Sequence, residues 1–325
     1  MNPLDRVPLG GTGVTVTRLG MGLAPIGGLF APVGDRAATD TVEAAWQAGI
    51  RFFDTAPHYG AGLSERRAGQ ALRHRPRTEF TLATKVGRRL VPGPPDPAGM
   101  WAEPTGDEPV FDFSAAGVRA AYEDSLSRLG VDRADVLHIH DPDHHFEPAL
   151  TGALPALVEL REAGLTGAVS AGMNQSAMLT DFARTGYFDC FLLAGRYSLL
   201  DQSALTDLLP ECATRGISVI VGGVYNSGIL ANPAPGATYD YAPATPAVLA
   251  RAQQIEQVCA RHEVPLRAAA LQFPLGHPAV ATVLVGMRSP AEVADAIAMA
   301  SVQIPGALWH DLKTAGLLDK EVPVP

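Results

Sequence analysis

The sequence predicts an α/β protein, a closed (β/α)8 TIM barrel preceded by a short β-hairpin. Short apolar runs alternate with helical patterns from about residue 18 onward, and eight such strand–helix units follow one another along the chain. No linker interrupts the units, so residues 1–325 form one predicted domain. Hydrophobic residues make up 47% of the chain, which provides enough apolar material for one large core.

The strands are expected where short apolar runs end in a polar residue, glycine or proline. They are Leu19–Gly22, Arg51–Asp54, Phe80–Thr84, Val136–Ile139, Gly167–Ala171, Cys190–Leu193, Ser218–Val221 and Thr282–Val285. Helices are expected where alanine and leucine recur at spacings of three and four residues. They are Ala37–Ala48, Ser64–Arg73, Ala115–Leu129, Ala149–Ala163, Gln175–Arg184, Ser203–Arg215, Pro246–Glu263 with Arg267–Gln272, and Pro290–Ala300. Residues 1–17 are expected to form the hairpin, and the tail from Ile304 an added helix.

Two connections are long and rich in Pro and Gly. One runs from Val86 to Phe113 and the other from Gly222 to Thr245. Structureless loops beyond about 12 to 15 residues are usually lids, binding loops or disordered segments. Both follow predicted strands on the top face of the barrel, so we expect a substrate lid and a cofactor lid respectively. Plain surface loops are the alternative.

Composition narrows the partners of the chain. The formal net charge is −9, and no basic run offsets the acids, which argues against nucleic acid and acidic membranes. No apolar run is long enough to span a bilayer, and the first residues lack the pattern of a signal peptide. Cys190, Cys212 and Cys259 show no CxxC spacing and are expected to be packing residues. We expect a cytoplasmic monomer or homo-oligomer that acts on a small molecule.

Four chemically active side chains stand at or just after the ends of three successive predicted strands. Asp54 ends one strand and Tyr59 follows it, Lys85 comes at the end of the next, and His140 at the end of the third. In a barrel the carboxyl ends of the strands meet on one face, which is where active sites lie. The sequence therefore predicts a catalytic tetrad.

The tetrad has the composition of a proton-transfer site. A tyrosine has a pKa near 10 and needs help to work at neutral pH. An ammonium about 4 Å away contributes on the order of 4 kcal/mol, or roughly three pKa units, so Lys85 is expected to bring Tyr59 into the working range. Asp54 would keep Lys85 charged and fixed, and His140 would donate a hydrogen bond to the reacting oxygen.

A run of imidazoles and carboxylates follows the third strand and raises the alternative of a metal site. Its members are His138, His140, Asp141, Asp143, His144 and His145. His138 and His140 share one strand face, but no further ligand motif stands elsewhere in the chain. We expect no metal, and we expect His144 and His145 to be solvated loop residues.

The order and spacing of several short motifs make the sequence resemble the aldo-keto reductase family. These motifs are Phe53–Ala56, Tyr59–Gly60, Leu63–Glu65, Thr84–Gly87 and His140–Pro142. The resemblance implies a barrel whose hairpin caps the bottom, and a nicotinamide cofactor that exchanges hydride while Tyr59 exchanges a proton. Asp54, Tyr59, Lys85 and His140 match the catalytic tetrad of the family.

The resemblance also predicts where the cofactor lies, because no GxGxxG motif follows a strand. Phosphates are expected on the loops after the last two strands, and Asn174 is expected to hold the carboxamide. The loop residues are Gly223, Val224, Asn226, Ser227, Gly228, Gly286, Arg288 and Glu292. Ala194 and Gly222 stand where the family commonly has a glutamine and a stacking ring. Glu292 would repel a 2′-phosphate whereas Arg288 would attract one, so NAD is preferred and NADP is the alternative.

Longer runs resemble the branch of D-threo-aldose 1-dehydrogenases, which includes L-fucose dehydrogenase. They are His140–Asp143, Asp189–Tyr197, Gly222–Leu230 and Ala269–Leu275. This implies oxidation of the C1 hydroxyl of a cyclic aldose, such as L-fucose, D-arabinose or L-galactose, to the lactone. The pocket is expected to include His58, Trp101, Asp141 and Tyr225. The alternatives are an aldehyde or ketone reductase, a pyridoxal 4-dehydrogenase, and, from a different class, a slow nicotinamide-binding redox-sensor subunit.

Overall fold

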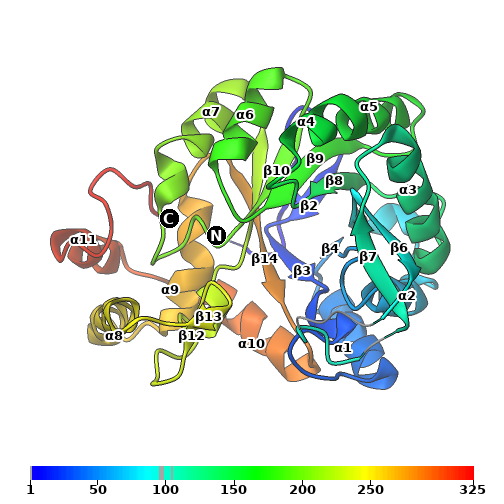
Figure 1. Cartoon of the computed structure of the whole chain (residues 1–325). Coiled ribbons are helices and arrows are strands. Elements are labelled where there is room, and N and C mark those ends of the chain that lie inside the picture. The colour runs from blue at the N-terminus through cyan, green and yellow to red at the C-terminus, as the bar shows by residue number, and fades with distance from the viewer. Residues whose placement is uncertain (1, 95–98, 104) are drawn as a thin grey trace.

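Eight parallel strands close into a barrel, which confirms the predicted fold. Figure 1 shows the strands at the centre of the molecule. The computed structural model describes residues 2–94, 99–103 and 105–325. Around the barrel the strands are β3 (Leu19–Gly22), β4 (Phe52–Asp54), β5 (Thr81–Val86), β8 (Val136–His140), β9 (Ala168–Met173), β10 (Cys190–Ala194), β11 (Ser218–Gly222) and β14 (Val280–Gly286). β14 pairs with β3, which closes the ring. All eight predicted strands are present at these positions.

Helices surround the barrel on its outside (Figure 1). They are α1 (Asp35–Gln47), α2 (Leu63–Leu72), α3 (Ala115–Leu129), α4 (Phe146–Pro148), α5 (Leu154–Glu162), α6 (Ala177–Thr185), α7 (Leu208–Arg215), α8 (Pro246–Arg261), α9 (Leu266–Gln272), α10 (Pro290–Ser301) and α11 (Gly306–Thr314). Two of them differ in detail from the expected ranges. A π-helical turn, Ala149–Ala153, precedes α5. α7 begins only at Leu208 because the carboxylate of Asp207 accepts the Leu208 N–H and starts the helix there.

The N-terminal hairpin seals the lower end of the barrel. It consists of β1 (Arg6–Pro8) and β2 (Thr15–Thr17), paired antiparallel. Leu9 and Val16 pack against Phe52 and Val136, which belong to the inner face of the barrel. Gly20 makes room for this layer, since a Cβ at that position would lie 2.6 Å from Phe52 Cδ1 and 2.8 Å from Leu284 Cδ2.

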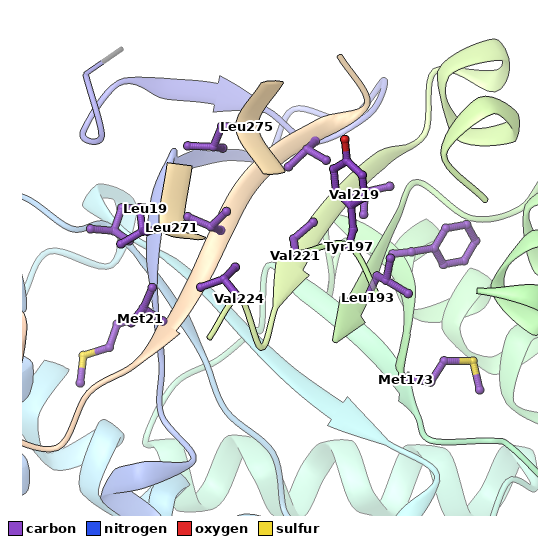
Figure 2. Close-up of a cluster of buried hydrophobic side chains, with 14 of the residues drawn as sticks. Leu19, Met21, Met173, Leu193, Tyr197, Val219, Val221, Val224, Leu271 and Leu275 are labelled. Atoms are coloured by element: carbon purple, nitrogen blue, oxygen red, sulfur yellow. The ribbon is translucent and has the colours of Figure 1, made fainter. Parts of the chain in front are cut away.

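A second, larger apolar layer fills the space between the strands and the helices. Leu19 of β3, Val221 of β11 and Leu271 of α9 belong to it, and Figure 2 shows them grouped around the outer surface of the barrel. Successive strand residues point to opposite faces, so the residues between these apolar ones point into the barrel. Those inward positions near the strand ends carry the polar groups described below.

The two long connections contain short antiparallel ribbons, which corrects the expectation of structureless loops. The first contains β6 (Arg88–Pro92) and β7 (Asp107–Phe111), and the second contains β12 (Thr238–Tyr239) and β13 (Ala242–Pro243). Prolines within these runs hid the strand pattern, although the edge position of each ribbon tolerates them. Within the described ranges, the structure contains no helix long and apolar enough to cross a membrane.

Candidate active site

The four residues of the predicted tetrad meet at the carboxyl ends of their strands. Asp54 ends β4, Lys85 lies near the end of β5 and His140 ends β8. Lys85 Nζ is 2.5 Å from Asp54 Oδ1 and donates a second hydrogen bond to Thr55 O at 2.9 Å. The same Nζ lies 4.9 Å from the centroid of the Tyr59 ring, and the ring of His140 is 5.9 Å from that of Tyr59.

The Lys85–Asp54 ion pair is buried, with 1% and 2% of the two residues exposed. Burial alone would raise the pKa of the Asp54 carboxyl, but Lys85 and His138 outweigh it and hold that pKa below its usual value. Asp54 is therefore a carboxylate that holds Lys85 charged and in place. This agrees with the arrangement expected from the sequence.

The pKa of Tyr59 differs from the value expected from the sequence. Burial, followed by the nearby carboxylates of Asp54 and Asp141, raises the pKa of Tyr59 well above its ordinary value. The expectation that Lys85 brings Tyr59 into the neutral range is therefore wrong for this structure. The physical reason is that burial of the phenol, together with the charges of Asp54 and Asp141, outweighs any effect of the Lys85 ammonium on this pKa. Burial and the positive charges of Arg88 and Lys85 lower the pKa of His140, so the site holds a neutral phenol beside a neutral imidazole.

A cavity of about 340 Å³ opens above these groups. Most of the predicted catalytic and substrate residues line it together with Asn174, namely His58, Tyr59, Lys85, Trp101, His140 and Asp141. Arg88 and Tyr241 also line it and were not expected. Arg88 opens the ribbon directly after the lysine strand, and Tyr241 lies between β12 and β13, so each belongs to one of the two long connections.

One wall of the cavity is charged. Arg88 Nη2 lies 2.7 Å from Asp141 Oδ2, and the same oxygen is 3.4 Å from His140 Nε2. Asp141 has a left-handed backbone with a φ of 44°, which turns its carboxylate at the end of β8. Burial raises the pKa of Asp141, against the opposing effect of Arg88. The Arg88 guanidinium also lies 4.6 Å from the centroid of the Phe111 ring. It is therefore held by the Phe111 ring of β7 and by the Asp141 carboxylate.

Another part of the cavity lining is aromatic. Trp101 lies edge-on to His58 with ring centroids 5.4 Å apart, and its centroid is 5.8 Å from that of Tyr59. Trp101 bridges to Leu29, so the first long connection lies against the loop after β3. Its indole nitrogen is buried and has no hydrogen-bond partner among the described residues. This N–H is a donor that a ligand oxygen can use.

The second long connection covers the cavity from the other side. The Tyr241 side chain interacts with the Asn174 amide, and its ring lies 6.4 Å from that of Phe30. Its backbone N–H donates to Ser227 Oγ at 3.0 Å. The predicted cofactor loop and this cover are therefore tied to each other.

The side chains of several predicted cofactor residues bind or pack within the protein and stabilise the loop that carries them. Asn226 Oδ1 accepts from Ser198 Oγ at 2.5 Å, and its Nδ2 donates to Gly195 O at 3.1 Å. Val224 is buried in the core. Their side chains shape the turn, where Gly223 and Gly228 have φ angles of 65° and 101°. A binding role for this segment therefore rests on its backbone.

The loop after β14 places Gly286, Arg288 and Glu292 together. The carboxylate of Glu292 accepts the Arg288 N–H at 2.9 Å and lies 3.2 Å from the Arg288 guanidinium. Ser289 caps α10 by accepting the Glu292 N–H, so Glu292 has a structural role as well as the predicted one. Tyr225 lies outside the cavity lining, within the electrostatic reach of Asp295 and Arg267, and its predicted substrate role is corrected.

The cavity fits a nicotinamide ring. Gly172, Leu192 and Ala194 give it a small apolar floor, and the Asn174 amide stands at the edge of this floor. A flat ring that carries one carboxamide matches this donor set, and Asn174 remains the predicted partner of the carboxamide. Because Ala194 has no polar group, the described residues of this floor give the carboxamide a single side-chain partner.

Comparisons with known proteins agree with this geometry. A model of the aldo/keto reductase family matches residues 18–315. D-threo-aldose 1-dehydrogenase from a Pseudomonas species is 41% identical over 315 residues, which cover 94% of this chain and 96% of that protein. Pyridoxal 4-dehydrogenase from Microbacterium luteolum is also 41% identical, over 97% of this chain and 98% of its own. The holo form of an aldo-keto reductase from Bacillus halodurans superimposes with a TM-score of 0.79 at 25% identity, over 98% and 97% of the two chains.

Proposed function

The chain belongs to the aldo/keto reductase family, and on that premise we propose that it oxidises the C1 hydroxyl of a cyclic aldose to the lactone with NAD. Membership makes it an oxidoreductase that uses a nicotinamide cofactor and a small-molecule substrate. The observation that carries the sugar proposal is the Arg88–Asp141 pair on the cavity wall. Its carboxylate is an acceptor for sugar hydroxyls, and the Trp101 N–H, which has no partner among the described residues, is a donor.

In the oxidising direction, the C1 hydroxyl of the sugar lies between Tyr59 and His140. The Tyr59 oxygen, in its phenolate form, would take the hydroxyl proton, while C1 would give up its hydrogen as hydride to the nicotinamide and become the carbonyl carbon of the lactone. Bound nicotinamide supplies the hydride acceptor. His140, neutral because of its burial, donates an N–H to the reacting oxygen and orients it.

The Lys85–Asp54 pair sets the charge balance of the step. An ammonium 4.9 Å from the Tyr59 ring favours the phenolate that the oxidation needs. Because the resting pKa of Tyr59 is raised, the fraction of phenolate increases with pH throughout the working range. The oxidation is therefore expected to be faster at alkaline pH, and the reverse reduction, in which Tyr59 gives its proton, at lower pH.

NAD is the proposed cofactor because of the pair at the start of α10. Glu292 neutralises Arg288, the one cation among the predicted cofactor residues, and a carboxylate accepts ribose hydroxyls but repels a 2′-phosphate. NADP would require Arg288 to leave this partner.

A second candidate is the oxidation of pyridoxal or the reduction of an aldehyde. The aromatic wall formed by His58 and Trp101 favours it, because a flat ring packs well against such a surface. The relative named pyridoxal 4-dehydrogenase matches this chain as well as the aldose dehydrogenase does.

The test follows absorbance at 340 nm with L-fucose, D-arabinose, L-galactose, pyridoxal and a simple aldehyde, each with NAD and NADP in the matching redox state. Tyr59→Phe removes the proton acceptor, and Tyr187→Phe, on the exposed surface, is the matched control. Reduction of NAD by sugars that is lost only in Tyr59→Phe supports the proposal. Turnover of aldehydes without any sugar oxidation would replace it with a carbonyl reductase. Tightly bound cofactor with negligible turnover would indicate the redox-sensor class.

A further inference from the structure

His138 lies directly beneath the tetrad and has no part in the mechanism described so far. It stands two residues before His140 on β8, so both side chains point into the barrel. It is fully buried, with Nδ1 2.7 Å from Ser170 Oγ and Nε2 3.2 Å from Asp54 Oδ2. A column of polar groups therefore runs from Ser170 through His138 and Asp54 to Lys85.

The position of the imidazole proton follows from the partners. Asp54 Oδ1 is taken by Lys85, while Asp54 Oδ2 and His138 Nε2 face each other and have no other partner among the described residues. A carboxylate only accepts, so the proton belongs on Nε2, where it points to Asp54. Nδ1 is then an acceptor, and the hydroxyl of Ser170 donates to it.

The charged and titratable groups around His138 come from four strands. Asp54 of β4 and Lys85 of β5 face its Nε2 side, and His140 lies above it on β8. Cys190 of β10 contacts Ser170, and burial raises the pKa of its thiol to about 12, so it carries no charge. Burial lowers the pKa of His138 despite the opposing effect of Asp54, so the imidazole is neutral in the working range.

We propose that His138 is a positioning residue for the catalytic ion pair: its Nε2–H holds Asp54 as a carboxylate and turns Oδ1 toward Lys85. The strength of the Lys85–Asp54 ion pair beside Tyr59 therefore depends on the hydrogen bond from His138 to Asp54. The inference rests on the proton transfer of the family reaction, not on the identity of the sugar.

Three substitutions separate this role from packing. Glutamine extends its amide nitrogen to about the place of Nε2, whereas asparagine reaches only about the place of Nδ1, and leucine fills the space without a donor. In His138→Gln, kcat should stay within about fivefold of wild type. In His138→Asn and His138→Leu, kcat should fall about 10- to 100-fold, the usual effect of losing a hydrogen bond to a charged group, while the substrate KM changes little.

The dependence of kcat on pH is a second measurement, and a packing defect alone would not change its apparent pKa. Without the Nε2–H, Asp54 keeps its proton to a higher pH, so the acid limb of kcat should shift upward in the Asn and Leu variants and not in the Gln variant. Equal losses in Gln, Asn and Leu, or a normal profile in a folded Leu variant, would overturn the proposal. If the Leu variant does not fold, the comparison of Gln with Asn decides.

A third measurement needs no turnover. Long-range ¹H–¹⁵N NMR of histidine-labelled protein, assigned by the His138→Gln variant, should show a neutral imidazole protonated at Nε2 from pH 6 to 9. Protonation at Nδ1, or titration near the ordinary pKa of about 6.5, would refute the inference. This result holds even if none of the sugars or aldehydes is a substrate, so failure of the proposed function and failure of this inference are distinguishable.

Discussion

Replacing Lys85 with methionine tests the electrostatic basis of the active site. The ammonium lies 4.9 Å from the Tyr59 ring, and at an effective dielectric near 20 its effect on a phenolate is about 3 kcal/mol. This corresponds to a loss of about two orders of magnitude in any step that needs the phenolate. The loss should appear in both directions, because oxidation consumes the phenolate of Tyr59 and reduction produces it.

The single substitution also leaves Asp54 buried without its partner. An uncompensated buried charge costs about 3 to 5 kcal/mol of folding stability, so Lys85→Met should unfold at a lower temperature. The double variant Asp54→Asn/Lys85→Met removes both charges. It should recover most of the thermal stability but only part of the activity, because Asp54 no longer raises the pKa of Tyr59 while the ammonium is still missing.

The assay measures kcat and KM for oxidation from pH 6 to 10, together with the thermal unfolding midpoint of each variant. Because the pKa of Tyr59 is raised well above its ordinary value, activity should rise with pH in both wild type and Lys85→Met, and the difference between them should persist to pH 10. If Lys85→Met retained more than about a tenth of the wild-type kcat for oxidation at pH 7, the electrostatic argument would be refuted.

Four further outcomes are expected. Asp141→Asn should raise the KM for sugars about tenfold or more and leave simple aldehydes nearly unchanged, in steady-state kinetics. Glu292→Gln keeps an oxygen for the cap but frees Arg288, so the ratio of kcat/KM for NADP over NAD should rise about tenfold. Gly20→Ala overpacks the barrel floor and should lower stability by about 1 to 3 kcal/mol in urea unfolding. His138 and His140 have lowered pKa values in the folded protein, so as the pH falls these imidazoles are protonated in the unfolded chain before they are in the folded one. The free energy of unfolding should therefore keep its full value above about pH 6.5 and decrease below it, and the decrease should be less steep in His138→Gln.

The sequence was sufficient to predict the barrel and the proximity of Asp54, Tyr59, Lys85 and His140. Each barrel strand is a short apolar run that ends at a polar residue or glycine, and the position of this end fixes which side chains reach the top face. Asp54, Lys85 and His140 could be placed together for that reason alone. The hairpin cap and the helix from Gly306 were also predicted, and both are present.

The missing parts depend on contacts between distant segments. Arg88 and Tyr241 reach the cavity only because ribbons in the two long connections turn back over the barrel, and proline obscured those ribbons in the sequence. Tyr225 was misplaced because one residue of a turn decides whether a side chain faces the cavity or the helices. The charge state of Tyr59 depends on burial and on Asp141, which no spacing along the chain reveals.

The apolar layer at the lower end of the barrel has a consequence for how protons and product reach solvent. Leu9, Val16 and Phe52 are buried and form an apolar layer below the polar column, which separates the column from solvent at the lower end. The cavity at the other end is lined by Tyr59, Trp101 and Tyr241. The proton released at Tyr59 and the product therefore share this upper cavity as their route to solvent.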